Sequence, residues 1–223
     1  MIEILYFIPI LLSAYVIGFK IFNFFNVKTT KLEESIFSVV FGFGFYSYLA
    51  FFLGVAGFLY SWVFWLAILF SLILWHRLWL QLIKSILSSF KKFKIKCDLE
   101  TFLIVVIAVF SVLALLSTLI PPFLWDELDY ELGIPKYYVM HHAIVPNFSS
   151  WASERTYHTN MLYVIGLLLK NGVLAKFFAL TNGLLLMFSI YAFGKKFYNR
   201  AIGLLASSIY ITLPMIMNHI GLV

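Results

Sequence analysis

Long apolar stretches are the feature that most constrains this chain. A transmembrane helix needs about 20 predominantly apolar residues, and such stretches occupy residues 4–25, 35–58, 59–80, 101–120, 173–193 and 201–220. In all, 63% of the 223 residues are hydrophobic, whereas soluble domains contain about 45–50% apolar residues. The sequence therefore predicts an all-α, polytopic transmembrane helix bundle with about six spans.

Three local signals refine this pattern. Only the short region 57–61 separates the second and third spans, so the two should form a tight helical hairpin. Lys170-Asn171-Gly172 interrupts a long apolar run, which makes residues 161–169 a short interfacial or re-entrant helix. Pro214 lies inside the last span and should kink it, which neighbouring helices can accommodate.

The chain divides into two predicted parts. Residues 1–100 hold three spans and a basic amphipathic helix, whereas residues 101–223 form a transmembrane core with an outer loop at 121–172. The amphipathic segment is residues 81–96, in which apolar residues recur at helical spacing and lysines take the other face. We expect it to lie on the inner leaflet and to bind anionic membrane lipids rather than nucleic acid.

Basic residues predict the orientation, because Lys and Arg are retained on the cytoplasmic side. If the loop after the first span is cytoplasmic, twelve of the sixteen Lys and Arg residues are cytoplasmic as well. The other four are Lys136, Arg155, Lys170 and Lys176. The loop 121–172 would then lie outside the cell membrane.

An acidic segment follows the fourth span directly. Four carboxylates fall within six positions, at Asp126, Glu127, Asp129 and Glu131. Pro121-Pro122 ends the span, so a new helix should begin at Asp126, which would be an N-cap or first-turn residue. On an α-helix, Asp126, Asp129, Tyr130 and Gly133 would share one face, and Glu127 and Glu131 the neighbouring one. The carboxylates are either functional groups or capping and solvation groups.

Cations and histidines of the outer loop provide further candidates. Lys136, Arg155, Lys170 and Lys176 could bind a lipid phosphate, or they could be ordinary side chains reaching to the headgroups. His141 and His142 are adjacent and point about 100° apart on a helix, so the pair alone does not make a metal site. Two alternatives remain for these histidines. They could bind a divalent metal together with His158 or a carboxylate, or they could simply lie at the membrane interface.

The order of motifs from Thr101 onward resembles the C-type (GT-C) membrane glycosyltransferases, which include protein O-mannosyltransferases and lipid A aminoarabinose transferases. The motifs are Trp125-Asp126-Glu127 with Tyr130 downstream, a helix ending in His142-Ala143-Ile144-Val145-Pro146, the short helix 161–169, and a span ending in Gly194-Lys195-Lys196-Phe197. Two features depart from that family: residues 1–100 add three spans, and Tyr157-His158-Thr159-Asn160 stands where the family has a basic-proline motif.

The resemblance implies an enzyme that moves a sugar from a polyprenyl-phosphate donor to an acceptor on the outer face of a prokaryotic inner membrane. It places the catalytic aspartate on Asp126, with Glu127 as its neighbour, and it implies no cofactor. The residues expected to bind substrate are Asp129, Tyr130, Lys136, Arg155, His158 and Lys176. Such enzymes carry further spans, so we expect this chain to be an N-terminal portion. The alternative is a non-catalytic transport component or structural subunit.

Overall fold

The structure is a computed structural model that describes residues 2–91, 98–146 and 159–221. These residues form helices and turns and contain no strand. In chain order the helices are α1 (Ile2–Phe24), α2 (Lys31–Val55), α3 (Ser61–Leu74), α4 (His76–Lys91), α5 (Leu99–Thr118), η1 (Glu127–Glu131), α6 (Gly133–His141), α7 (Asn160–Leu169), α8 (Gly172–Phe197), α9 (Arg200–Thr212) and α10 (Pro214–Gly221).

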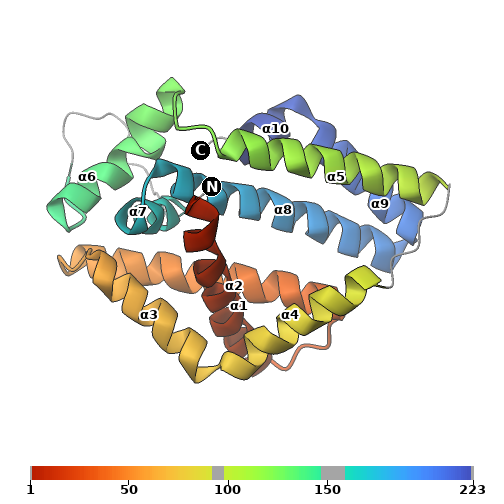
Figure 1. The fold of residues 1–223 in the computed structure, drawn as a ribbon, viewed down its shortest axis with the longest axis horizontal. Helices are drawn as coiled ribbons and strands as arrows, with labels where there is room; N and C mark the ends of the chain where they lie inside the picture. The colour runs from red at the N-terminus through yellow and green to blue at the C-terminus, as the bar shows by residue number, and fades with distance from the viewer. Residues whose placement is uncertain (1, 92–97, 147–158, 222–223) are drawn as a thin grey trace.

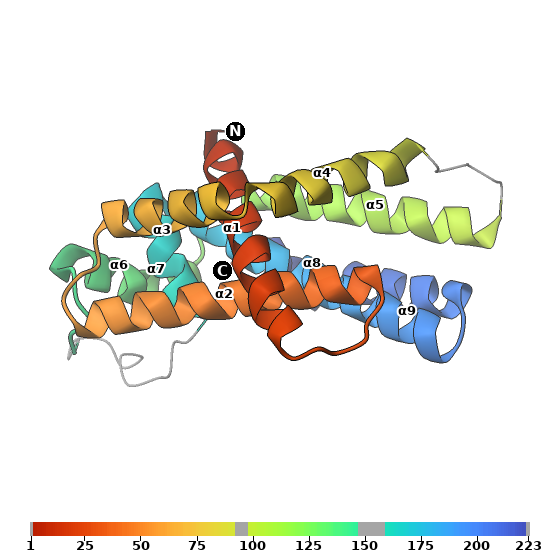
Figure 2. The ribbon, with the colours of Figure 1, turned by 90° about the horizontal axis from the view of Figure 1, so that it is seen from below.

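Helices α2, α5 and α8 run along the long axis of the molecule, and α1 crosses α2 steeply (Figures 1 and 2). Within the described residues, four helices, α1, α2, α5 and α8, are long and apolar enough to cross a membrane. Two bent pairs, α3 with α4 and α9 with α10, raise that number to six if each pair is one span. The prediction of an all-α, multi-pass membrane protein is confirmed.

The third span does not continue to residue 80 as one helix, and that prediction was wrong. Helix α3 ends at Leu74, and the chain bends by 75° into α4. Side chains beyond the bend bind carbonyls that the interruption leaves free: Trp79 Nε1 donates to Leu72 O at 3.1 Å, and His76 Nδ1 lies 3.2 Å from Ile73 O. The amphipathic helix therefore begins at His76, five residues earlier than expected, and residues 92–96 of its predicted course lie outside the described part of the chain.

The predicted kink in the last span is confirmed. Helices α9 and α10 meet at an angle of 74°. Leu213 between them has an extended backbone, with φ −64° and ψ 125°. The residue before a proline is driven to that region by contact with the proline ring, so Pro214 accounts for the break.

Small residues and hydroxyls join the first three helices. A Cβ atom on Gly18 would collide with Ser38 O, and one on Gly42 would collide with Ala14 O. Two small residues spaced four apart on each helix therefore let the α1 and α2 backbones meet, as is common between membrane helices. Beside this crossing, Ser13 of α1 is hydrogen-bonded to Tyr46 of α2 and to Ser71 of α3, all three being buried.

Helix α7 is a short, buried element that positions the candidate site. It runs from Asn160 to Leu169, beginning one residue earlier than predicted, and all but two of its ten residues are buried. Gly166 packs so closely on Ala175 that an added Cβ would come within 2.6 Å of the Ala175 backbone. This contact fixes the first turn of α8, and Lys176 follows directly after that turn.

Candidate functional site

The acidic segment begins with a wide helical turn rather than an α-helix. Residues Glu127–Glu131 form a π-helix, in which the Leu132 amide donates to Glu127 O at 2.9 Å, five residues back. The expectation that Asp126, Asp129, Tyr130 and Gly133 share one α-helical face was wrong, because each π turn holds more residues than an α turn. Asp126 itself lies in helical backbone just before η1, and its side chain makes no capping hydrogen bond.

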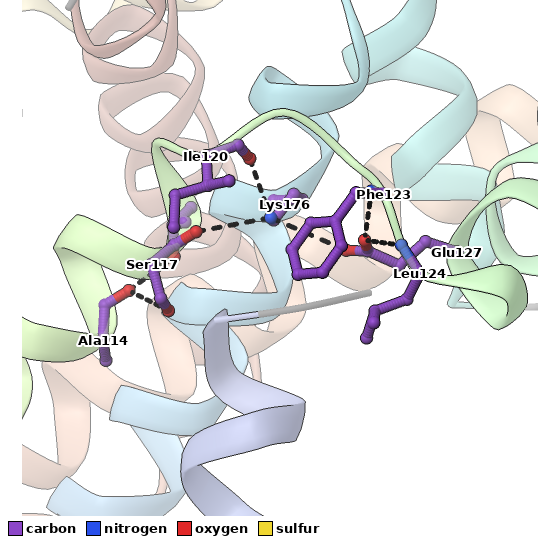
Figure 3. A network of polar contacts seen from close by, with 8 residues as sticks. Ala114, Ser117, Ile120, Phe123, Leu124, Glu127 and Lys176 are labelled. Carbon is purple, nitrogen blue, oxygen red and sulfur yellow. Dashed lines mark hydrogen bonds and ion pairs between the residues drawn. The ribbon is translucent and has the colours of Figure 1, made fainter.

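Glu127 supplies the cap that we expected from Asp126. Its Oε2 accepts hydrogen bonds from the backbone amides of Phe123, at 3.0 Å, and Leu124, at 3.2 Å (Figure 3). These amides belong to the start of the new helix, where backbone donors lack partners within the helix. The Glu127 side chain is fully buried, so its negative charge needs such partners.

Lys176 of α8 approaches Glu127 from the other side. Its Nζ lies 3.6 Å from Glu127 Oε1 and donates to the backbone carbonyls of Ile120, at 2.9 Å, and Ser117, at 3.4 Å (Figure 3). Those carbonyls stand at the C-terminal end of α5, where helical carbonyls lack partners and the helix dipole favours a cation. Like Glu127, the Lys176 side chain is fully buried.

The two charges therefore bridge the end of one helix and the start of the next. Lys176 caps α5, Glu127 caps the helix that follows, and the ion pair closes the turn through Pro121-Pro122. Gly172 supports this turn, since an added Cβ there would come within 2.8 Å of the Pro122 ring. Removing one partner of such a buried pair typically costs about 3–5 kcal/mol, because the other charge is left without compensation.

The turn that the Glu127–Lys176 pair holds leaves Asp126 at the protein surface. Its side chain is exposed, and within the described ranges no group donates a hydrogen bond to its carboxylate. Its neighbours Trp125 and Leu128 are 76% and 58% exposed, so the carboxylate lies among apolar side chains of the kind that contact lipid. Such a carboxylate can accept a proton or a hydrogen bond from a substrate.

The remaining predicted residues lie in different surroundings. Asp129 is half-buried, Tyr130 packs partly against the hydrophobic core, and Lys136 of α6 is exposed. Among the predicted site residues whose positions are described, Glu127 and Lys176 are in direct contact. Arg155 and His158 lie outside the described residues, so their predicted roles stay predictions.

Sequence reasoning missed a second polar anchor of the loop. The side chain of buried Asn160, at the start of α7, donates to Glu131 Oε2 at 2.8 Å and to Glu131 O at 3.2 Å. Burial, and to a lesser degree the charge of Glu131, raise the pKa of nearby Tyr163 above its ordinary value. The sequence did hold one signal for this role of Asn160, which is a polar residue directly before an apolar stretch.

The adjacent histidines serve the packing of α6 in this structure. His142 ends that helix with φ 55°, its Nδ1 donates to Leu59 O at 2.9 Å, and its ring stacks on Tyr60. His141 Nδ1 donates to Tyr137 O at 2.8 Å. Across the residues with described positions, no group of three or more His, Cys, Asp or Glu side chains is arranged to hold a metal ion.

Comparison with known proteins gives no relative. No protein-family model, no curated protein and no solved structure matches this chain. The function is therefore inferred from the residues, their geometry and the resemblance in motif order.

We expect Lys176→Met to lower the free energy of unfolding by about 3–5 kcal/mol, because Glu127 would be left as a buried, unpaired charge. Thermal or denaturant unfolding in detergent micelles measures this. Glu127→Gln should also destabilise, whereas the double variant should lose clearly less than the sum of the two single losses.

The matched control is Asp126→Asn, next to Glu127 but exposed, which should change stability by no more than about 0.5 kcal/mol. Strictly additive losses at Glu127 and Lys176 would contradict a direct coupling between these two charges.

Proposed function

We propose that this chain belongs to a membrane glycosyltransferase that moves a sugar from a polyprenyl-phosphate donor to an acceptor at the outer membrane face. The observation that carries the proposal is the exposed carboxylate of Asp126, held beside the end of α5 by the buried Glu127–Lys176 pair. The motif order around Trp125-Asp126-Glu127 supports the same reading.

The surroundings of Asp126 suit a lipid-linked donor. Phe123, Trp125 and Leu128 expose 61%, 76% and 58% of their surfaces, and aromatic side chains with this exposure favour the membrane–water boundary. The phosphate of a polyprenyl-phosphate sugar lies at the same depth, since its hydrocarbon chain stays in the bilayer. Asp126 can therefore meet a donor from the membrane and an acceptor from water.

The proposed reaction is a single displacement at the anomeric carbon. Asp126 accepts the proton of the acceptor hydroxyl, and the hydroxyl oxygen forms a bond to that carbon as the bond to the donor phosphate oxygen breaks. The polyprenyl phosphate leaves with the bonding electron pair. A cation stabilises the charge that grows on this phosphate, and the exposed Lys136 of α6 is available for that role.

We infer a different task for Glu127 and Lys176 than the predicted contact with substrate. Glu127 and Lys176 are fully buried and occupied by each other and by backbone groups. A substrate phosphate could replace these partners only if the turn opened. We therefore treat Glu127 and Lys176 as positioning residues that hold the loop and its exposed carboxylate in place.

Asp126→Asn should lower turnover by about 10²-fold or more, because the amide cannot take the acceptor proton. The measurement is release of polyprenyl phosphate from polyprenyl-phosphate mannose and polyprenyl-phosphate aminoarabinose by membranes that contain the full-length protein. The amount of folded protein in the membrane is measured in parallel.

Asp129→Asn is the control, since Asp129 is half-buried in the same turn and should cost less than about tenfold in turnover. Full activity in Asp126→Asn would refute the catalytic assignment. Absence of any donor cleavage by the unmodified full-length protein would favour a non-catalytic transport or structural role.

The proposed orientation rests on where the cations gather. Ion pairs Lys196–Glu33, at 2.7 Å, and Arg200–Glu100, at 3.2 Å, join the end of α8, the start of α9 and the starts of α2 and α5. This basic end lies opposite the end that carries α6 and α7 (Figure 1). By the bias of basic residues we propose that it is cytoplasmic and that the loop 121–172 is external.

A reporter fused after Lys96 should therefore behave as cytoplasmic, and one inserted near Ser150 as external. Alkaline phosphatase, which is active only outside the cytoplasm, and a fluorescent protein that folds inside it measure the two positions. The reverse pattern would place Asp126 on the wrong face and would overturn the proposed function as well.

A further inference from the structure

A cavity lined by both polar and apolar side chains lies beside the start of α2. It has a volume of about 280 Å³, opens to the surroundings, and lies between α1, the first turn of α2 and the first half of α4. Its lining consists of Tyr15, Phe19, Lys31, Glu34, Ser35, Leu78, Gln81, Leu82 and Ser85. In a chain with only 12% charged residues, this concentration of polar groups calls for an explanation.

The cavity offers one positive and one negative charge that do not neutralise each other. Lys31 and Glu34 both line it, and within the described ranges neither side chain has an opposite charge within 4.0 Å. The neighbouring Glu33, in contrast, forms an ion pair with Lys196 and accepts a hydrogen bond from the backbone amide of Thr30. A ligand that carries both charges close together would satisfy Lys31 and Glu34 at once.

The expected position of the cavity in the membrane restricts the class of ligand that the cavity can bind. Lys31 is the first residue of α2, which is long and apolar enough to span a membrane. If α4 lies on the inner leaflet, as its sequence predicts, the cavity lies at the level of the lipid headgroups. Phe19, Leu78 and Leu82 add an apolar wall beside the polar groups. This combination matches a lipid headgroup with the upper part of its acyl chains, rather than a water-soluble metabolite.

We propose that this cavity binds the headgroup of phosphatidylethanolamine. The phosphate would pair with Lys31, and the ammonium would donate hydrogen bonds to the Glu34 carboxylate and to the side-chain carbonyl of Gln81. Hydrogen bonds between charged groups are the stronger ones, and both ends of the headgroup make them here. A lipid headgroup that carries only negative charge could pair with Lys31, but the carboxylate of Glu34 would repel it.

Phosphatidylcholine provides a sharp comparison, because its quaternary ammonium carries no N–H group and cannot donate to Glu34. Native mass spectrometry of the delipidated protein, titrated with dioleoyl phosphatidylethanolamine, phosphatidylcholine or phosphatidylglycerol, measures the binding. We expect phosphatidylethanolamine to bind about tenfold more tightly than either other lipid, since only its headgroup carries a cation that can donate hydrogen bonds to Glu34. Soluble glycerophosphoethanolamine should compete poorly, because it lacks the acyl chains.

Two variants test the assigned contacts. Glu34→Gln should remove the preference for phosphatidylethanolamine over phosphatidylcholine, and Lys31→Gln should weaken all three lipids several-fold. Gln81→Leu provides a third test on a different helix and should weaken phosphatidylethanolamine most. The matched controls Lys28→Gln and Glu100→Gln remove the same charges from residues that do not line the cavity, and they should leave binding unchanged.

Equal binding of phosphatidylethanolamine and phosphatidylcholine by the unmodified protein would overturn the proposal. The same holds if the control variants lower binding as much as Lys31→Gln and Glu34→Gln, since the effect would then come from surface charge alone. Efficient competition by glycerophosphoethanolamine would show a site for a soluble phosphoethanolamine compound and would contradict a lipid site.

Discussion

The buried ion pair between Glu127 and Lys176 is the interaction on which the candidate site depends. A lysine and a glutamate without solvent contact are costly in an apolar protein, yet here each charge also serves a helix end that needs a partner. Lys176 binds carbonyls at the end of α5, and Glu127 binds amides at the start of the next helix. The pair thus fixes the turn between a membrane helix and the acidic segment, and Asp126 owes its exposed position to that turn.

Other buried polar groups in the bundle also have hydrogen-bond partners within the protein. Without water, buried hydroxyls and amides must be satisfied by the protein itself. Ser13, Tyr46 and Ser71 bind one another across three helices. Asn171 caps α8 at Leu174 and also donates to Glu3 at the start of α1, at 3.1 Å. These contacts tie helices that are distant in sequence, and they hold the scaffold around the first turn of α8 in one arrangement.

Much of this fold could be predicted from the sequence, because apolar length alone marks a membrane helix. The bounds of α2, α5 and α8 agree with the predicted spans to within four residues. Apolar length did not reveal the bend after Leu74, because the apolar run resumes at Leu78 beyond His76 and Arg77. The break itself depends on local hydrogen bonds of Trp79 and His76. Spacing rules could not predict the π turn or a contact between Glu127 and Lys176, which lie in separate elements.

Hydrogen–deuterium exchange over residues 121–132 tests this account most directly. The amides of Phe123 and Leu124 are bound by Glu127, so they should exchange slowly in the unmodified protein. In Lys176→Met the turn should loosen, and exchange in this stretch should rise at least about tenfold while α9 stays unchanged. Fast exchange of these amides in the unmodified protein, or equal protection in the variant, would contradict the claim that the buried pair holds the candidate site together.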